Sequence, residues 1–253
     1  MFRNAGVLVL SALMAACQRG PTAEQKEILS ILIQAGFPEN DIQFYDGDVY
    51  VGRDGHVTLE AARELRFDSD PNVGCGLPSN MVGKSVTRIC VNPSASFNSY
   101  SRLSQGLDAA INNYNELGLR ITFARGPTSG CTANIWADTM SGTGGSAGFP
   151  SGGRPYGAIK IGVGLQNYSE DVNERVITHE LGHTIGRRHS DYFDRTITCG
   201  SGGDVGAGTK GAILITGSPS TAIVGGSVMN SCVSSTETGE WTGSDRTALN
   251  YLY

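Results

Sequence analysis

Residues 179–189 read His-Glu-Leu-Gly-His-Thr-Ile-Gly-Arg-Arg-His, a run with the residue types and spacing of a metal site. His179 and His183 are four residues apart, so a helix places both imidazoles on one face. Gly186 can adopt the positive φ that ends a helix, which lets His189 return as a third ligand. Three neutral imidazoles leave the fourth position of a tetrahedral zinc ion open, as in catalytic sites.

Glu180 lies next to the first of these histidines and fits the role of general base. When zinc polarises a carbonyl group, a carboxylate can take a proton from water and pass it to the leaving amine. The predicted chemistry is water-mediated amide hydrolysis with one zinc ion. The chain has only 4 histidines, so three unrelated ones in this pattern are a poor alternative. A zinc site that binds without catalysis is a second alternative, and it would not need Glu180.

The histidine pattern resembles the metzincin clan of zinc metallopeptidases. Met229, in the run Ser-Val-Met-Asn, matches the methionine turn that lies beneath the metal in that clan. The resemblance narrows to the dual-action HEIGH metallopeptidases through residues 179–186, 147–153 and 245–253. It implies an α+β metzincin fold with a twisted mixed sheet, an active-site helix and a Met-turn, and it implies zinc endopeptidase activity.

The same resemblance implies that residues 157–164 form an edge strand, along which a polypeptide substrate lies extended and pairs main chain to main chain. An edge strand without any ligand is the alternative. A zinc amidase acting on envelope peptides and a non-catalytic, envelope-anchored metal- or peptide-binding protein are the alternative functions.

Hydrophobic periodicity indicates the elements that position these residues. Helices are predicted at residues 22–34, 58–65 and 103–117, and a further helix carries the metal ligands, with Asp171 and Glu174 at its start. Strands are predicted at residues 42–51, 85–91, 119–123, 133–137 and 158–163, with a flexible stretch at 141–153.

The amino terminus indicates export. Arg3 is followed by an uncharged run that ends at Cys17, too short for the ~20 residues of a membrane span. We interpret residues 1–16 as a signal peptide. Residues 13–17, Leu-Met-Ala-Ala-Cys, resemble a bacterial lipobox, which predicts lipidation of Cys17 and a cell-envelope lipoprotein; a plain secretory signal is the alternative.

The composition excludes some partners. The chain of 253 residues has a net charge of -5 and no basic run, so we expect no nucleic-acid partner. The only predicted membrane contact is the lipid at Cys17, and we expect a monomer. Asp191 and Asp194 could hold calcium, but their spacing matches no calcium motif, which favours a role in bracing a loop.

Export permits disulfides among the 6 cysteines. We favour Cys90 with Cys131 and Cys199 with Cys232, although sequence alone does not fix the connectivity. Cys75, in the run Cys-Gly-Leu-Pro, resembles part of the matrixin cysteine switch, in which a thiolate blocks the open zinc position. The flanking arginine and aspartate of that switch are missing, so a disulfide or an idle thiol is the alternative.

These observations divide the chain into three parts: a signal peptide at 1–16, a tether and prosegment at 17–79, and a metzincin catalytic domain at 80–253. A small stabilising subdomain is the alternative for the middle part. Removal of a prosegment by cleavage at exposed loops would release a soluble enzyme from the lipid anchor.

Overall fold

The structure is a computed structural model, and it describes residues 20–67, 80–127, 129–203, 215–233 and 237–253. The helices are α1 (Ala23–Gln34), α2 (Leu59–Phe67), α3 (Ala95–Ser99), α4 (Ser101–Glu116), α5 (Glu170–Thr184), α6 (Thr196–Cys199) and α7 (Gly243–Leu252), with 3-10 turns η1 (Glu39–Asp41) and η2 (Val163–Asn167). The strands are β1 (Gln43–Tyr45), β2 (Asp48–Val51), β3 (Gly55–His56), β4 (Arg88–Pro93), β5 (Thr122–Arg125), β6 (Ala133–Met140), β7 (Gly145–Gly148) and β8 (Ala158–Gly162).

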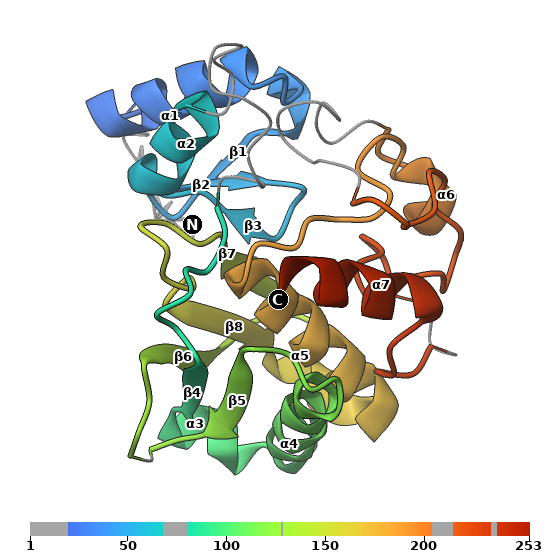
Figure 1. Cartoon of the computed structure of the whole chain (residues 1–253). Helices are drawn as coiled ribbons and strands as arrows, with labels where there is room; N and C mark the ends of the chain where they lie inside the picture. Colours follow the sequence, from blue (N-terminus) through green and yellow to red (C-terminus); the bar gives the residue numbers. More distant parts are fainter. Residues whose placement is uncertain (1–19, 68–79, 128, 204–214, 234–236) are drawn as a thin grey trace, which may run out of the picture.

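Within the described residues these strands form one twisted, mixed sheet in the order β1-β2-β3-β7-β8-β6-β4-β5 (Figure 1). β4, β5, β6 and β8 are mutually parallel where they pair, whereas β7 runs antiparallel to β8 and parallel to β3. α4 and α5 pack side by side, and α5 also packs on β7 and β8. The predicted α+β class with a twisted mixed sheet is confirmed.

The described residues form two separate hydrophobic cores. The larger core lies between the sheet and α4, α5 and α7, and its residues fall between 82 and 249. The smaller core lies between α1, α2 and β2, and Phe149 is the one contribution from outside residues 28–65. Residues 20–67 therefore have a core of their own, and we call them the N-terminal unit; they are the blue and teal part of Figure 1.

The helix that carries the predicted ligands begins slightly earlier than expected. Ser169 is the N-cap of α5, and its hydroxyl accepts a hydrogen bond from the amide of Val172 at 3.3 Å, so Asp171 lies inside the first turn. α5 ends at Thr184, and Gly186 follows with a φ of 104°. The glycine turn after the helix is as predicted, and it reverses the chain toward His189.

One strand prediction is wrong, and one strand was missed. Residues 42–51 do not form one strand but the β1–β2 hairpin, because Asp46 and Gly47 both have positive φ and turn the chain. The stretch 141–153 was expected to be flexible, yet it contains β7. Its Gly-Ser-Ala-Gly sequence has no β-branched or aromatic residue, so propensity did not indicate a strand.

Both predicted disulfides are present. Cys90 of β4 is bonded to Cys131, which lies just before β6, and Cys199 of α6 is bonded to Cys232. None of the helices in the described part of the chain is long and apolar enough to cross a membrane.

Candidate metal centre

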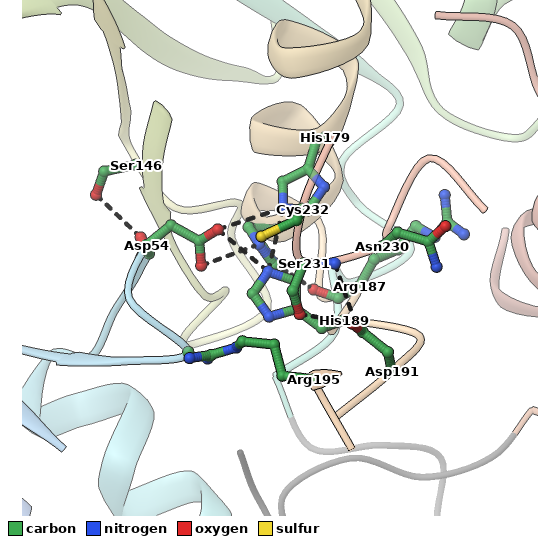
Figure 2. Close-up of polar contacts among 12 residues, drawn as sticks. Asp54, Ser146, His179, Arg187, His189, Asp191, Arg195, Asn230, Ser231 and Cys232 are labelled. Atoms are coloured by element: carbon green, nitrogen blue, oxygen red, sulfur yellow. Dashed lines mark hydrogen bonds and ion pairs between the residues drawn. The ribbon is translucent and has the colours of Figure 1, made fainter. Parts of the chain in front are cut away.

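The three histidines of the predicted metal site converge near the C-terminal end of α5. His179 and His183 lie one turn apart on that helix, and His189 returns after the Gly186 turn. All three side chains are buried, and the Nε2 atoms of His179 and His189 are 3.2 Å apart. Figure 2 shows His179 and His189 directed toward a common point. The structure thus brings together the residues whose spacing predicted a metal site.

Backbone carbonyls fix the orientation of the two helical imidazoles. The Nδ1 atom of His179 is 2.8 Å from the carbonyl oxygen of Val228, and that of His183 is 2.8 Å from the carbonyl oxygen of Arg187. A carbonyl only accepts, so Nδ1 carries the proton and donates it in both cases. Nε2 is then an unprotonated donor atom for a metal, oriented by the second hydrogen bond of each ring.

Burial also keeps these rings neutral. Desolvation lowers the pKa of His179 to about 4, against a weaker opposing effect of Asp54. Desolvation lowers the pKa of His183 well below its usual 6.5 as well. Both imidazoles are therefore neutral at pH 7, and a neutral imidazole is the form that coordinates a metal ion.

A fourth donor at this point is Asp54, which sequence reasoning missed. Asp54 lies in the turn between β2 and β3, more than a hundred residues before the histidines. Its Oδ2 is 3.1 Å from His189 Nε2 and 3.5 Å from His179 Nε2, and its Oδ1 is 3.8 Å from His183 Nε2. No local pattern marks an aspartate in a hairpin turn as a ligand, so only the three-dimensional fold reveals it.

These separations fit a tetrahedral metal ion. Zinc bonds of about 2.0–2.1 Å place ligand atoms about 3.3 Å apart on the edges of a tetrahedron. Asp54 Oδ2 and the Nε2 atoms of His179 and His189 are separated from one another by 3.1, 3.2 and 3.5 Å. His183 Nε2 and Asp54 Oδ1 are buried and have no hydrogen-bond partner, so a cation at this point would satisfy both. The donor set therefore fits zinc.

Glu180 lies beside this centre and is fully enclosed. Its side chain packs against the backbone of β7, where a Cβ built on Gly145 would come within 2.2 Å of Oε1. Oε2 is buried without a hydrogen-bond partner. Burial, and then the negative charge of Asp54, raise the pKa of this carboxyl well above 4.5. Only glycine at position 145 leaves room for the glutamate.

Asp245 connects the metal site to the C-terminal helix α7. Its Oδ2 accepts a hydrogen bond from the amide of Val228 at 3.0 Å, and its Oδ1 forms a buried ion pair with Arg187. Val228 and Arg187 are the residues whose carbonyls orient His179 and His183. The run from Thr242 to Asp245 forms a capping box at the start of α7, and neither this helix nor the connection was predicted from the sequence.

Met229, the residue of the predicted Met-turn, is buried and packs against Gly182 of α5. A Cβ built on Gly182 would lie 2.7 Å from its sulfur and 3.2 Å from the hydroxyl of Tyr114. Gly182 therefore allows the methionine to approach the helix between the two ligand-bearing turns. Met229 is part of the packing under the site, and it is not among the residues that converge on the metal position.

The expectation that residues 157–164 form an edge strand is wrong. β8 lies inside the sheet, because β6 pairs with one side of it and β7 with the other. Within the larger-core part of the sheet, β7 is the outermost strand on this side, and its outer edge is paired with β3 of the N-terminal unit. β7, which contacts Glu180, is thus the strand next to the metal position.

The remaining predicted residues have structural roles or cannot be placed. Cys17 and Cys75 lie outside the described residues. Asp191 accepts hydrogen bonds from the amide and hydroxyl of Ser231 at 3.0 and 2.7 Å, and Asp194 accepts one from the amide of Thr196 at 3.0 Å. Both aspartates therefore brace loops through these contacts.

Comparison with known proteins identifies the family. Residues 49–253 match the family model of the dual-action HEIGH metallopeptidases. The chain belongs to this family. It is therefore a metallopeptidase, as the histidine pattern and the resemblance indicated. No curated protein matches the chain significantly.

Solved structures similar to this family member include a zinc-protease and myroilysin. One is high choriolytic enzyme 1, a hatching enzyme zinc-protease from the medaka fish Oryzias latipes, with 16% identity, 72% of this chain and 98% of that chain covered, and a TM-score of 0.40. Two structures of myroilysin have 14% and 13% identity and TM-scores of 0.40 and 0.43; they cover 72% and 69% of this chain, and 87% and 96% of their own.

Proposed function

We propose that this metallopeptidase is a zinc endopeptidase of the metzincin type, with His179, His183 and His189 as ligands and Glu180 as general base. The observation that carries the proposal is the position of Glu180. Its carboxyl group lies between the ligand-bearing face of α5 and the backbone of Gly145 in β7, a strand that can bind an extended peptide. Metal position, proton acceptor and peptide-binding edge are therefore adjacent.

Zinc, when bound, supplies a Lewis acid that polarises the scissile carbonyl group and makes the attacking water more acidic. The residues of this chain do the rest. Glu180 accepts a proton from the attacking water and returns it to the nitrogen of the leaving amine. Val228 and Arg187 hold the imidazoles in place through their carbonyl oxygens, so the ligand atoms need little reorganisation during the reaction.

The substrate in this proposal is a polypeptide that pairs with the outer edge of β7. The turn before β3 already makes contacts of this kind with β7. The hydroxyl of Ser146 and the amide of Ala147 donate hydrogen bonds to the carbonyl oxygen of Asp54, at 2.9 and 3.2 Å. The carboxylate of the same Asp54 lies at the imidazoles of the metal site, as Figure 2 shows for His179 and His189. Main-chain pairing explains how a peptide would be held extended over the metal, and an endopeptidase needs no closed pocket at either end.

The proposal includes export and anchoring. Removal of residues 1–16 and lipidation of Cys17 would place a monomeric enzyme in the bacterial cell envelope, and later removal of residues 17–79 would release it. The support is the uncharged amino-terminal run and its lipobox-like end. Mass spectrometry of the amino-terminal peptide from cells that express the chain tests this part, since a lipid on Cys17 has a defined mass.

The test of the catalytic proposal compares Glu180→Gln with Glu170→Gln in a quenched-peptide library assay, before and after limited proteolysis. Glu170 lies on the same helix with a side chain 48% exposed, so its variant is the matched control. We expect Glu180→Gln to lose at least about 100-fold in kcat, the low end of general-base contributions. Metal analysis should find one zinc per chain in the parent and both variants.

Two results would contradict the catalytic proposal. Equal cleavage by the parent and Glu180→Gln would exclude this residue as general base. One bound zinc in a parent that cleaves no peptide, whether intact or after proteolysis, would favour the amidase or the binding protein instead.

A further inference from the structure

The turn between β2 and β3 enters the metal site as a unit. Gly52 packs on His189 so closely that a Cβ built there would lie 3.0 Å from Nδ1 of the ring. Two residues later, the Asp54 carboxylate contacts the imidazoles at 3.1–3.8 Å. Gly52 has a φ of 65° and Arg53 one of 79°, so the backbone makes a tight turn that directs Asp54 inward. The N-terminal unit thus supplies a side chain to a site otherwise built by residues 179–189.

A buried ion pair holds this turn in position. Oδ2 of Asp41 accepts the amide hydrogen of Gly52 at 2.8 Å, and Oδ1 lies 3.2 Å from Nη1 of Arg195. The Arg195 side chain is 2% exposed and that of Asp41 8%, so the pair is shielded from water. Arg195 precedes α6, in the loop after the third histidine. The turn is therefore fixed to the same loop that carries His189.

The N-terminal unit also covers the edge proposed to bind substrate. Gly55 and His56 of β3 pair with Ala147 and Gly148 of β7 in parallel. Gly55 is tightly packed, because a Cβ built on it would meet the ring of Phe149 at 2.7 Å. A peptide cannot use the same edge while β3 is paired with it. One short segment, residues 52–56, therefore occupies both the metal position and the peptide edge.

We propose that the N-terminal unit is an internal inhibitor, in which Asp54 is the fourth protein ligand of the metal and β3 takes the place of substrate on β7. This inference rests on the proposed peptidase function. The site is closed while Asp54 is bound, because four protein donors leave no position for water in a tetrahedral site. Withdrawal or removal of the N-terminal unit opens the metal position and the edge together. The latch is then a carboxylate in the β2–β3 turn, in place of the thiolate expected at Cys75.

The separate core of the N-terminal unit fits this role. Phe149 is the only residue from outside the unit in the smaller core, among the residues that the structure describes. The unit therefore does not depend on the larger core for its apolar packing, and the larger core contains none of its residues. Departure of the unit would expose Phe149 and the edge of β7 and leave the larger core intact.

The test uses the full chain loaded with Co²⁺, whose visible absorption reports its ligands, and compares the parent with Asp54→Asn and Asp46→Asn. Asp46 is an exposed turn residue with a φ of 50°, which asparagine also adopts, so its variant is the matched control. Acetohydroxamate is the probe, because it binds only to a metal with an open position. We expect it to change the spectrum of Asp54→Asn at concentrations at least about tenfold lower than in the parent or Asp46→Asn.

Peptide cleavage by the zinc forms of the same three proteins is the second readout. In the intact proteins β3 still covers the edge of β7, so we expect cleavage by Asp54→Asn to stay as low as in the parent and to appear in all three proteins after limited proteolysis. A changed cobalt spectrum without any cleavage, even after limited proteolysis, would support the inhibitor and contradict the peptidase. Equal access of acetohydroxamate to parent and variants would overturn the latch and leave the peptidase intact. If Asp54→Asn does not fold, the cobalt spectrum of the parent tests the latch by itself. Ready binding of acetohydroxamate to the parent would exclude a fourth protein ligand.

Discussion

The two helical imidazoles, His179 and His183, are held through Nδ1 by the larger-core region, whereas all three imidazoles are contacted through Nε2 by the N-terminal unit. The first set of contacts consists of carbonyls fixed by the buried Asp245, behind which lies the larger core. The second is made by the Asp54 carboxylate, which the β3–β7 pairing and the buried Asp41–Arg195 pair hold in place. The comparison shows that the geometry of the ligands and the access to them are controlled by different parts of the molecule.

The largest effect is expected where the first set of contacts is broken. Asp245→Asn leaves Arg187 buried without its counter-ion and weakens the hydrogen bond to the amide of Val228. Breaking a buried pair from one side costs roughly 3–5 kcal/mol of the free energy of unfolding. Because both helical imidazoles lose support, zinc affinity should fall about 10–100-fold. Urea denaturation and chelator competition measure the two effects.

The matched control for this change is Glu116→Gln. It breaks the ion pair between Glu116 of α4 and Arg246 of α7, whose side chains are 44% and 45% exposed, and such pairs contribute at most about 1 kcal/mol. Similar losses of stability and zinc affinity in the two variants would show that Asp245 has no specific role in supporting the imidazoles.

The same variant also tests how the contribution of Asp245 to stability depends on pH. Burial raises the pKa of Asp245, but Arg187 and the hydrogen bonds from Ser227 and Val228 outweigh this and hold the pKa below 3.8. A carboxyl with a lower pKa in the folded than in the unfolded state stabilises the protein above the unfolded value. That contribution is lost as pH falls through the folded pKa. The difference in unfolding free energy between the parent and Asp245→Asn should therefore be constant above about pH 5 and shrink progressively as the pH falls further.

The sequence predicted which histidines come together, but neither the Asp245 connection nor the contact with Asp54. The three histidines, Glu180 and the glycine turn follow from spacing within one helix and its end, where local geometry determines which side chains meet. Asp54 reaches the site through strand pairing between β3 and β7, and β7 itself has glycine, serine and alanine in place of the usual strand formers. Contacts that depend on such pairing leave no periodic signal in the sequence.

The same reason explains the misplaced edge strand. Residues 158–162 have the apolar alternation of a strand, and the prediction of a strand there was right. Its neighbours could not be read from the sequence, because β7 was not recognised and the N-terminal unit was not expected to extend the sheet. Strand order is a property of the whole chain, whereas the ligand spacing belongs to eleven consecutive residues.

A smaller effect is expected where the two regions meet, at β7. Gly145→Ala places a methyl group in the space of the Glu180 carboxylate, which must move. We expect kcat to fall at least about tenfold in preparations activated by limited proteolysis, since general-base catalysis depends on reach within hydrogen-bond distance. Zinc content and KM should change little, because neither the ligands nor the pairing groups of β7 are altered.

Gly144→Ala is the control for that change. It is the neighbouring glycine, and a Cβ built on it meets no heavy atom within 4 Å. An equal loss of kcat in both variants would indicate a general effect on the strand, and an unchanged kcat in Gly145→Ala would show that Glu180 tolerates displacement.

The smallest effect is expected inside the N-terminal unit, away from the turn that enters the site. Glu27 of α1 and Arg63 of α2 form an ion pair at 2.8 Å with side chains 45% and 54% exposed. Glu27→Gln should cost at most about 1 kcal/mol. Because this exposed pair joins α1 to α2 and does not involve β3, we expect hydrogen exchange to quicken in these helices and to stay unchanged in β3. Equally fast exchange in β3 would mean that the N-terminal unit opens as one cooperative element, so that α1, α2 and the pairing of β3 with β7 open together. Access to the metal position would then depend on the stability of α1 and α2.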